Sequence, residues 1–339
     1  MKEPDMMEIR EDSLRPPALE AEARRLFEDD VRRLLLRRNE FVSVNCPACE
    51  MVGAVPQFEK NGFEFHECAA CGTLFVSPRP TSELLAQYYG EGAAGRFWNR
   101  CVFPASAPVR RELIFRVRVE LVAQVIGRKP VETLVDVGAG FGWFASLCRE
   151  AGLARRVIAV EPNRELAASC REVEGVEVIE APIEHAYETL DADVITSFEL
   201  IEHTFEPRAF LDACRRRLRP GGLFVCTTPN WSGFDVALLR ERSDNVTGPN
   251  HLQLFTPGSL RQALQRAGFR EIKVSTPGQL DVDILRNKML TGVFQPSELP
   301  FFGPLICEGS SELRRELQAW LGKHGLSSNM MAVARAVMS

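Results

Sequence analysis

A short apolar run that leads directly into three closely spaced glycines is the feature that most limits how this chain can fold. The run is Leu134–Val137, the glycines are Gly138, Gly140 and Gly142, and a helical stretch follows. Glycine lets a chain turn sharply and approach a ligand closely. A helix that begins at such a turn also offers backbone N–H groups without intrahelical partners. The segment therefore predicts a strand, a ligand-binding loop and a helix.

The chain after residue 130 alternates between β-branched runs and helical stretches, which is typical of a parallel sheet with helices on both faces. A helix from Pro207 to Leu218 has a clear start and stop, with proline at its first turn and Pro220-Gly221 after it. We therefore predict an α/β fold. The expected strands are 134–137, 157–160, 176–179, 194–198 and 223–227.

An acidic residue lies where a nucleotide ribose is expected. The second strand ends at Glu161, which is 161 − 142 = 19 residues beyond the last glycine, the place of a ribose-binding carboxylate. A dinucleotide loop would require a third glycine where this chain has the large Trp143. The glycines instead read G-x-G-x-G, and Asp136 precedes them.

This pattern resembles motif I of the class I S-adenosylmethionine-dependent methyltransferases. The resemblance implies that the loop holds the methionine part of S-adenosylmethionine and that Glu161 binds the ribose hydroxyls. Many relatives have Asp or Asn after the third strand for the adenine amine. This chain has Glu180-Ala-Pro-Ile-Glu there, so we expect the adenine against backbone and Ile183. The expected cofactor-binding residues are Asp136, Gly138, Gly140, Phe141, Gly142, Glu161, Pro162, Pro182, Ile183 and Phe198.

Later segments resemble the ubiquinone-biosynthesis type and the methyltransferase type 23 group. They are Ser197-Phe-Glu-Leu-Ile-Glu-His, Leu218-Arg-Pro-Gly-Gly-Leu, and Asn250-His-Leu-Gln-Leu-Phe-Thr-Pro. The end of the chain, from Leu326, resembles the antiparallel last strand of that Rossmann-like sheet. The resemblance therefore implies a cofactor domain over residues 131–339, with a helical insertion at about 280–325.

Four cysteines form two C-x-x-C pairs, Cys46/Cys49 and Cys68/Cys71, with 68 − 49 − 1 = 18 residues between them. Four thiolates at this spacing can enclose Zn²⁺ tetrahedrally, which leaves no open position for a substrate. We predict a structural zinc module over residues 41–80. Unligated cysteines or a redox pair are the alternatives. Several sugar C-methyltransferases carry a similar module before the same cofactor domain.

Glu199, Glu202, His203 and His251 are the expected catalytic residues, because the first three follow the fourth strand, where this fold transfers methyl groups. Three roles stay open. The cluster can bind a divalent cation such as Mg²⁺. The pattern E-x-x-E-H with a later histidine resembles the metal site of small-RNA 2′-O-methyltransferases. One histidine can instead be a general base. Glu202 and His203 can also simply brace the loop.

Three helical regions complete the predicted organisation. They are an N-terminal segment at 1–40, a cap at 81–130 with interruptions near Pro104 and Pro108, and the insertion. We expect them to cover the carboxyl ends of the strands, where such folds bind ligands, and to set the specificity.

Composition narrows the function. The net charge of −5 gives no general attraction to nucleic acid or to anionic membranes. No apolar run reaches the roughly 20 residues that span a bilayer, and residues 1–15 do not resemble a signal peptide, so we expect a cytoplasmic protein.

We predict methyl transfer to an O, N or C nucleophile of a small molecule, such as a sugar nucleotide or another biosynthetic intermediate. The alternatives are an RNA-modifying methyltransferase and a non-catalytic cofactor-binding scaffold. The sequence leaves the oligomeric state open.

Overall fold

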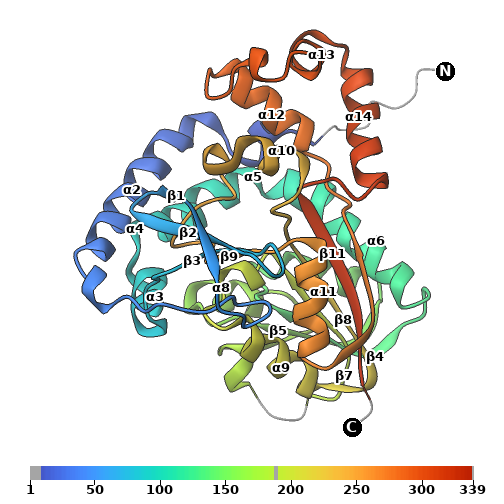
Figure 1. The fold of residues 1–339 in the computed structure, drawn as a ribbon. Coiled ribbons are helices and arrows are strands. Elements are labelled where there is room, and N and C mark those ends of the chain that lie inside the picture. Colours follow the sequence, from blue (N-terminus) through green and yellow to red (C-terminus); the bar gives the residue numbers. More distant parts are fainter. Residues whose placement is uncertain (1–8, 187–189, 338–339) are drawn as a thin grey trace, which may run out of the picture.

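The computed structural model describes residues 9–186 and 190–337. Its centre is a seven-stranded sheet in the order β10-β11-β8-β7-β4-β5-β6, and Figure 1 shows the helices around it. Strand β11 runs antiparallel to both of its neighbours, and the pairs from β8 to β6 are parallel. The strands are β4 (Val131–Val137), β5 (Ala154–Val160), β6 (Val176–Ile179), β7 (Ala192–Phe198), β8 (Leu218–Pro229), β10 (Phe269–Ser275) and β11 (Asn329–Ala336).

The predicted α/β fold class, with its parallel strands and antiparallel last strand, is confirmed. Central strands β4 and β7 are buried over nearly their whole length, as expected when helices cover both faces of a parallel sheet. The connecting helices are α7 (Trp143–Glu150), α8 (Arg164–Arg171), α9 (Pro207–Arg217), α10 (Phe234–Leu239) and α11 (Pro257–Arg266).

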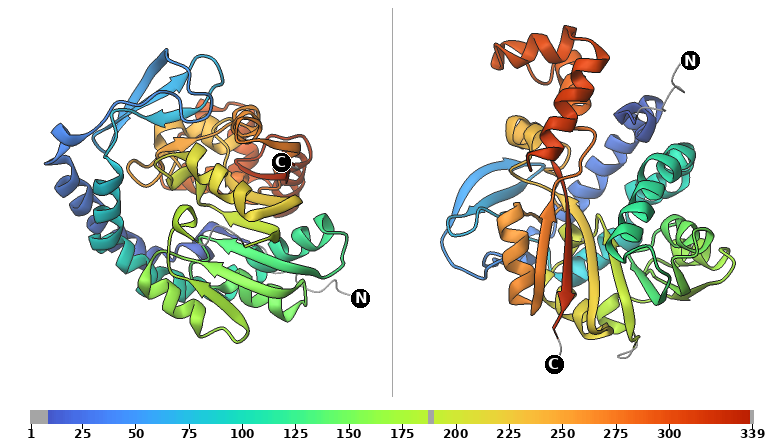
Figure 2. Two further views of the ribbon diagram at one scale, coloured as in Figure 1. Left: turned by 90° about the horizontal axis from the view of Figure 1, so that it is seen from below. Right: turned by 90° about the vertical axis from the view of Figure 1, so that its right-hand side faces the viewer.

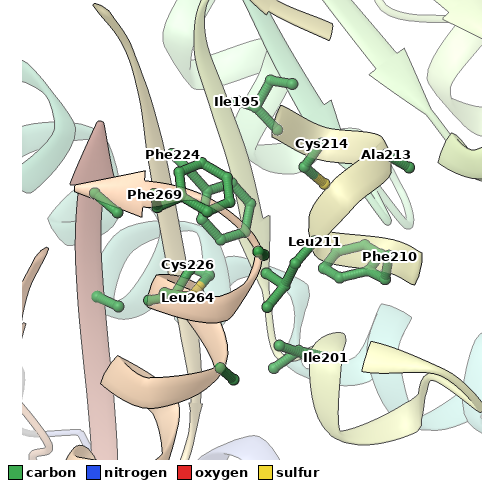
Figure 3. Close-up of a cluster of buried hydrophobic side chains, with 14 of the residues drawn as sticks. Ile195, Ile201, Phe210, Leu211, Ala213, Cys214, Phe224, Cys226, Leu264 and Phe269 are labelled. Atoms are coloured by element: carbon green, nitrogen blue, oxygen red, sulfur yellow. The ribbon is translucent and has the colours of Figure 1, made fainter. Parts of the chain in front are cut away.

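Two buried clusters hold the layers together. One face of the sheet packs against α7 and against α6 (Arg116–Val125) through side chains such as Leu134 and Phe144. The other face packs against α9 and α11, where Phe224 and Phe269 lie 5.3 Å apart between ring centroids. Figure 3 shows Leu211 of α9 and Leu264 of α11 closing over this second cluster.

A second sheet has the order β1-β2-β3-β9 and contains strands from two distant parts of the chain. Strands β1 (Ala54–Lys60), β2 (Phe63–Cys68) and β3 (Leu74–Val76) come from the cysteine module, and β9 (Gln253–Leu254) follows His251. The buried cysteines Cys46, Cys49 and Cys68 belong to the same apolar cluster as α9 and α11. The module therefore shares its core with the main sheet.

The helical path before β4 contains two segments with π-type hydrogen bonding. It runs through α3 (Ser82–Glu91), α4 (Ala93–Phe97), η2 (Trp98–Val102), α5 (Phe103–Arg110), η3 (Arg111–Phe115) and α6. We expected breaks near Pro104 and Pro108, and this expectation was wrong. Pro104 lies in the first turn of α5 and Pro108 lies inside that helix. The chain stays helical on both sides of α5, where the N–H of Phe103 donates to the carbonyl oxygen of Trp98 and that of Arg116 to the carbonyl oxygen of Arg111, the i→i−5 bonds of π-type turns.

Further helices lie at the carboxyl ends of the parallel strands. Figures 1 and 2 show the insertion at the end of the sheet opposite the C-terminus. Its helices are α12 (Asp281–Leu290), α13 (Phe302–Glu308) and α14 (Ser311–Lys323), and the N-terminal ones are α1 (Glu11–Leu14) and α2 (Pro17–Leu35). Within the described ranges, no helix is both long and apolar enough to cross a membrane.

Candidate active site

The glycine loop joins the end of β4 to the start of α7. Gly138, Gly140 and Gly142 all have φ between +57° and +73°, a backbone region that residues with a Cβ rarely adopt. The N–H of Gly140 donates to Glu161 Oε2 over 2.8 Å, and the N–H of Asn163 donates to Glu161 Oε1 over 2.9 Å. One carboxylate therefore fixes both the loop and the end of β5.

Packing leaves little room for a side chain at two of these glycines. A Cβ at Gly138 would lie 2.8 Å from a methyl carbon of Leu200, and one at Gly142 would lie 3.3 Å from Cys170 Cα. Gly138 and Gly140 line the cavity described below, and Gly142 is absent from its lining. We had predicted all three to bind the cofactor. Gly142 lies against Cys170 of α8, and its part in cofactor binding stays a prediction.

A cavity of about 970 Å³ opens at the carboxyl ends of β4, β5 and β7. This volume is near the upper end of the range for small-molecule sites, so it has room for a cofactor together with a second molecule. Every other expected cofactor-binding residue lines it, as do all four expected catalytic residues. These are Asp136, Gly138, Gly140, Phe141, Glu161, Pro162, Pro182, Ile183, Phe198, Glu199, Glu202, His203 and His251.

Two buried carboxyl groups mark the cofactor end of the cavity. Burial raises the pKa of Glu161, and two backbone N–H groups oppose that rise. Burial likewise raises the pKa of Asp136 to about 7, although Thr196 Oγ1 donates to its Oδ1 over 2.8 Å. Asp136 therefore titrates near neutrality, and a cation bound beside it would favour its charged form.

Arg118 of α6 is a cavity residue that the sequence analysis missed. Its Nη2 donates to Glu199 Oε1 over 3.0 Å and to Thr227 Oγ1 over 3.3 Å. The guanidinium also lies 4.8 Å from the ring centroid of Phe198. Burial lowers the pKa of this arginine, but an arginine stays charged. No spacing rule links a residue of the helical cap to the fourth strand, so only the structure reveals it.

His203 and His251 meet across the other end of the cavity, with ring centroids 4.8 Å apart. His203 Nδ1 lies 2.8 Å from the carbonyl oxygen of Asn250, and His251 Nδ1 lies 2.7 Å from that of Asn245. A carbonyl oxygen can only accept, so each Nδ1 carries the proton and each Nε2 keeps its lone pair. Burial lowers the pKa of His203 and lowers that of His251 to about 3, which makes both rings neutral bases.

The acidic members of the predicted cluster separate. Glu202 stays with the histidines: one of its oxygens accepts from Thr228 Oγ1 over 2.8 Å, and the other, Oε1, is buried without a hydrogen-bond partner among the described residues. The potential ligand atoms of Glu202, His203 and His251 lie within 4.8 Å of one another. Glu199 lies outside this group. It accepts from Arg118, from Thr227 Oγ1 over 2.6 Å and from Asn329 Nδ2 over 3.0 Å.

The four module cysteines converge as the sequence predicts. Their sulfur atoms lie within 4.8 Å of one another. Cys46 and Cys71 are 3.5 Å apart, and so are Cys49 and Cys68. The hydrogen bond with Cys46 lowers the pKa of the Cys71 thiol to about 5. The same hydrogen bond raises the pKa of Cys46, so within this pair Cys71 is the thiolate, the form that binds metals.

Comparison with known proteins agrees with this geometry. Residues 109–274 match the family described as a methyltransferase domain. The match covers strands β4 to β8, the glycine loop and both histidines. Together, the strand order, the loop and the family match define a class I S-adenosylmethionine-dependent methyltransferase domain.

Individual relatives share part of the chain. A probable S-adenosylmethionine-dependent methyltransferase of Mycolicibacterium smegmatis is 30% identical over 142 residues, which are 40% of this chain and 51% of that protein. A ubiquinone biosynthesis O-methyltransferase of Maricaulis maris is 30% identical over 155 residues, 42% of this chain and 61% of that protein. The chain thus spans about half the length of the first of these relatives.

Among solved structures, a 1,6-didemethyltoxoflavin-N1-methyltransferase of Burkholderia thailandensis is 15% identical, with a TM-score of 0.49. The alignment covers 84% of this chain and all of that one.

Proposed function

We propose that this protein transfers a methyl group from S-adenosylmethionine to an oxygen nucleophile of a small molecule with a largely apolar body. The observation that carries the proposal is a single cavity with the glycine loop and Glu161 at one end and two neutral histidines at the other. Bound S-adenosylmethionine supplies an electrophilic methyl group. The chain's own task is then to position the acceptor and to remove one proton.

The cofactor end fits S-adenosylmethionine in charge as well as in shape. Each Glu161 oxygen accepts one backbone N–H and keeps a lone pair for a ribose hydroxyl. Asp136 provides a carboxylate for the positive amino and sulfonium groups, and Arg118 provides a positive charge for the methionine carboxylate. Ile183 and Phe141 offer apolar surface to the adenine.

The acceptor end favours an apolar molecule over a sugar nucleotide. All three helical regions contribute apolar side chains to the cavity lining, among them Leu14, Leu113, Ile114, Leu280 and Ile284. Among the cationic side chains of the lining, Arg110 is held by Ser106 over 2.8 Å and by the carbonyl oxygen of Leu14 over 2.9 Å. The name of the Maricaulis maris relative, an O-methyltransferase, supports an oxygen nucleophile.

The histidine pair serves best as the base. Both Nε2 lone pairs are free at neutral pH, and the backbone carbonyl oxygens of Asn250 and Asn245 fix both rings. Either ring can accept the proton of an acceptor hydroxyl, and the pKa of about 3 makes His251 the weaker base of the two. His251 and its partner Asn245 both line the cavity, so we assign His251 the contact with the acceptor.

A divalent cation at Glu202, His203 and His251 is the second candidate role, and the unpartnered Glu202 Oε1 favours it. His203 Nε2 lies 3.9 Å from Glu202 Oε1. Ligands about 2.0–2.2 Å from one ion on adjacent coordination positions would lie about 3 Å apart, so this group would have to contract. Two imidazoles also suit Zn²⁺ or Fe²⁺ better than Mg²⁺. The alternative of metal-assisted RNA methylation would need the same three residues as ligands.

The cysteine group fits structural zinc. Four sulfurs about 2.3 Å from a tetrahedral Zn²⁺ would lie about 3.8 Å apart, close to the observed pairs at 3.5 Å. Zinc held by Cys46, Cys49, Cys68 and Cys71 would replace the weak hydrogen bonds between their thiol groups with metal–sulfur bonds. Its role would be to stabilise the module's turns.

A panel of acceptors tests the proposed function. The protein should produce S-adenosylhomocysteine from S-adenosylmethionine when hydroxylated apolar compounds are present, and the product should carry an O-methyl group. Turnover with sugar nucleotides but with no apolar hydroxyl compound would contradict the acceptor assignment, and turnover with RNA would favour the alternative.

A further inference from the structure

The cysteine module is bonded directly to the segment that carries His251. Strand β3 of the module pairs with β9, so that Leu74 faces Leu254 and Phe75 faces Gln253. Strand β9 begins two residues after His251, and it is the edge strand of the module's own sheet. The β-ladder between β3 and β9 therefore ends two residues from His251.

The backbone of Leu252 connects the module to the Glu202–His203 turn. Its carbonyl oxygen accepts from the N–H of Val76 over 2.9 Å, and its own N–H donates to the carbonyl oxygen of Glu202 over 2.9 Å. One residue thus bonds on one side to the module and on the other to the turn that carries the second histidine. These bonds use backbone groups, so they depend on the position of β3 and not on side-chain identity.

Gln253 and Arg79 form a second, side-chain connection. Gln253 is 1% exposed, and its Nε2 donates to the carbonyl oxygens of Ile201 and Thr204 over 2.7 and 2.8 Å. These two carbonyl groups flank the Glu202–His203 turn. Arg79, 3% exposed, donates to Gln253 Oε1 over 3.0 Å. The Gln253 side chain therefore fixes the turn by hydrogen bonds, and Arg79 of the module fixes the Gln253 side chain.

Arg79 is itself anchored at the module's end. Its backbone N–H and C=O pair with those of Val42, at 3.0 and 2.8 Å. Its guanidinium lies over the ring of Phe205, 4.9 Å from the centroid. Burying a cation costs free energy unless hydrogen bonds compensate for the lost water. The bond from Arg79 to Gln253 is therefore important for keeping this arginine buried.

We propose that the cysteine module is a positioning device for the two histidines, and that Arg79 and Gln253 are the positioning residues that connect them. The inference rests on the proposed function, because it assigns a purpose to holding His203 and His251 in place. Neither Arg79 nor Gln253 lines the cavity, so both act through the Glu202–His203 turn and β9. This gives the module, in which zinc held by four cysteines would leave no position for a substrate, a part in catalysis.

Two substitutions test the connection: Arg79→Gln and Gln253→Leu in the full chain. We expect turnover to fall about 10²-fold, the effect of displacing catalytic groups by about 1 Å. The zinc content, the KM for S-adenosylmethionine and the affinity for S-adenosylhomocysteine should stay at wild-type values. Arg79→Lys, which keeps a donor for Gln253, should restore most of the turnover.

Arg266→Gln is the matched control. Arg266 of α11 pairs with Glu50 of the module, so this change also removes an arginine link between module and domain, but one that does not lead to the turn. It should leave turnover unchanged. Wild-type turnover in both Arg79→Gln and Gln253→Leu would overturn the proposal, and so would an equal loss in Arg266→Gln.

A spectroscopic readout separates this inference from the proposed function. Ring-nitrogen NMR of the five histidines should show His203 in one Nδ1–H tautomer in the wild type and in a mixture in Gln253→Leu, whether or not an acceptor is known. An unchanged tautomer would contradict the connection even if methyl transfer is confirmed. If Gln253→Leu does not fold, Gln253→Glu keeps the acceptor for Arg79, loses both donors, and decides by the same spectrum.

Discussion

The rings of His203 and His251 stand nearly perpendicular, at 78°, and each donates its Nδ1 proton to a backbone carbonyl oxygen. Both Nε2 atoms are thereby left as acceptors at the wall of the same cavity. This relationship makes proton removal the chemistry that the site supports best, and it can be tested one residue at a time.

His251→Ala should lower turnover by about 10²–10⁴-fold, the usual contribution of a general base, with little effect on S-adenosylhomocysteine affinity. Initial rates and calorimetry measure the two effects separately. His324→Ala is the control, since His324 is absent from the cavity lining. If His251→Ala is fully active, His203 becomes the only remaining histidine candidate in the cavity.

Chelation distinguishes the base from the cation. With a histidine base, EDTA should leave turnover unchanged as long as the zinc content of the protein stays constant. Loss of activity that Mn²⁺, Zn²⁺ or Mg²⁺ restores would instead support the cation at Glu202, His203 and His251. In that case Glu202→Gln should raise the metal concentration required, whereas a change at Glu199, which lies outside the group, should not.

Asp136 should make cofactor binding depend on pH. Its pKa is raised to about 7 by burial, and the positive groups of S-adenosylmethionine favour the charged carboxylate. Below pH 7 the Asp136 carboxyl group must lose a proton before the cofactor binds. The affinity should therefore rise as the pH approaches 7 and level off above it. Titration calorimetry from pH 5.5 to 8.5 measures this. Asp136→Asn should abolish the dependence, and an unchanged slope in that variant would show that another group is responsible.

The zinc proposal predicts about one zinc per chain in freshly purified protein. Because Cys46 lies in the apolar cluster shared with α9 and α11, Cys46→Ser should lower the melting temperature of the whole domain and not of residues 41–80 alone. Elemental analysis and thermal unfolding check the two statements. Purified protein without zinc would refute the site, and Cys101→Ser, at a cysteine outside the cluster, is the control.

Features with a local cause were predictable from the sequence. The runs that became β4 to β8 are short and apolar, the glycines mark the loop, and Glu161 lies at the spacing that a second strand imposes. The spacing of the two C-x-x-C pairs likewise predicts that their four sulfur atoms converge. In each case the nearby residues alone determine the structure.

Features set by distant contacts were not predictable. Strand β9 joins the module's sheet because Leu252 and Gln253 meet β3, and nothing around residue 253 signals that partner. Glu199 was grouped with the histidines on spacing alone, but Arg118, from another helix, binds it. The interruptions expected near Pro104 and Pro108 do not occur either: the chain stays helical through η2, α5 and η3.

The central claim is that Glu161 and the glycine loop bind S-adenosylmethionine, and calorimetry with S-adenosylhomocysteine tests it most directly. The account predicts one site per chain, with no comparable affinity for NAD. Glu161→Ala should weaken binding by about 2–4 kcal/mol, since two charge-assisted hydrogen bonds of about 1.5–3 kcal/mol each are lost. Unchanged affinity in Glu161→Ala, or tighter binding of NAD than of S-adenosylhomocysteine, would contradict it.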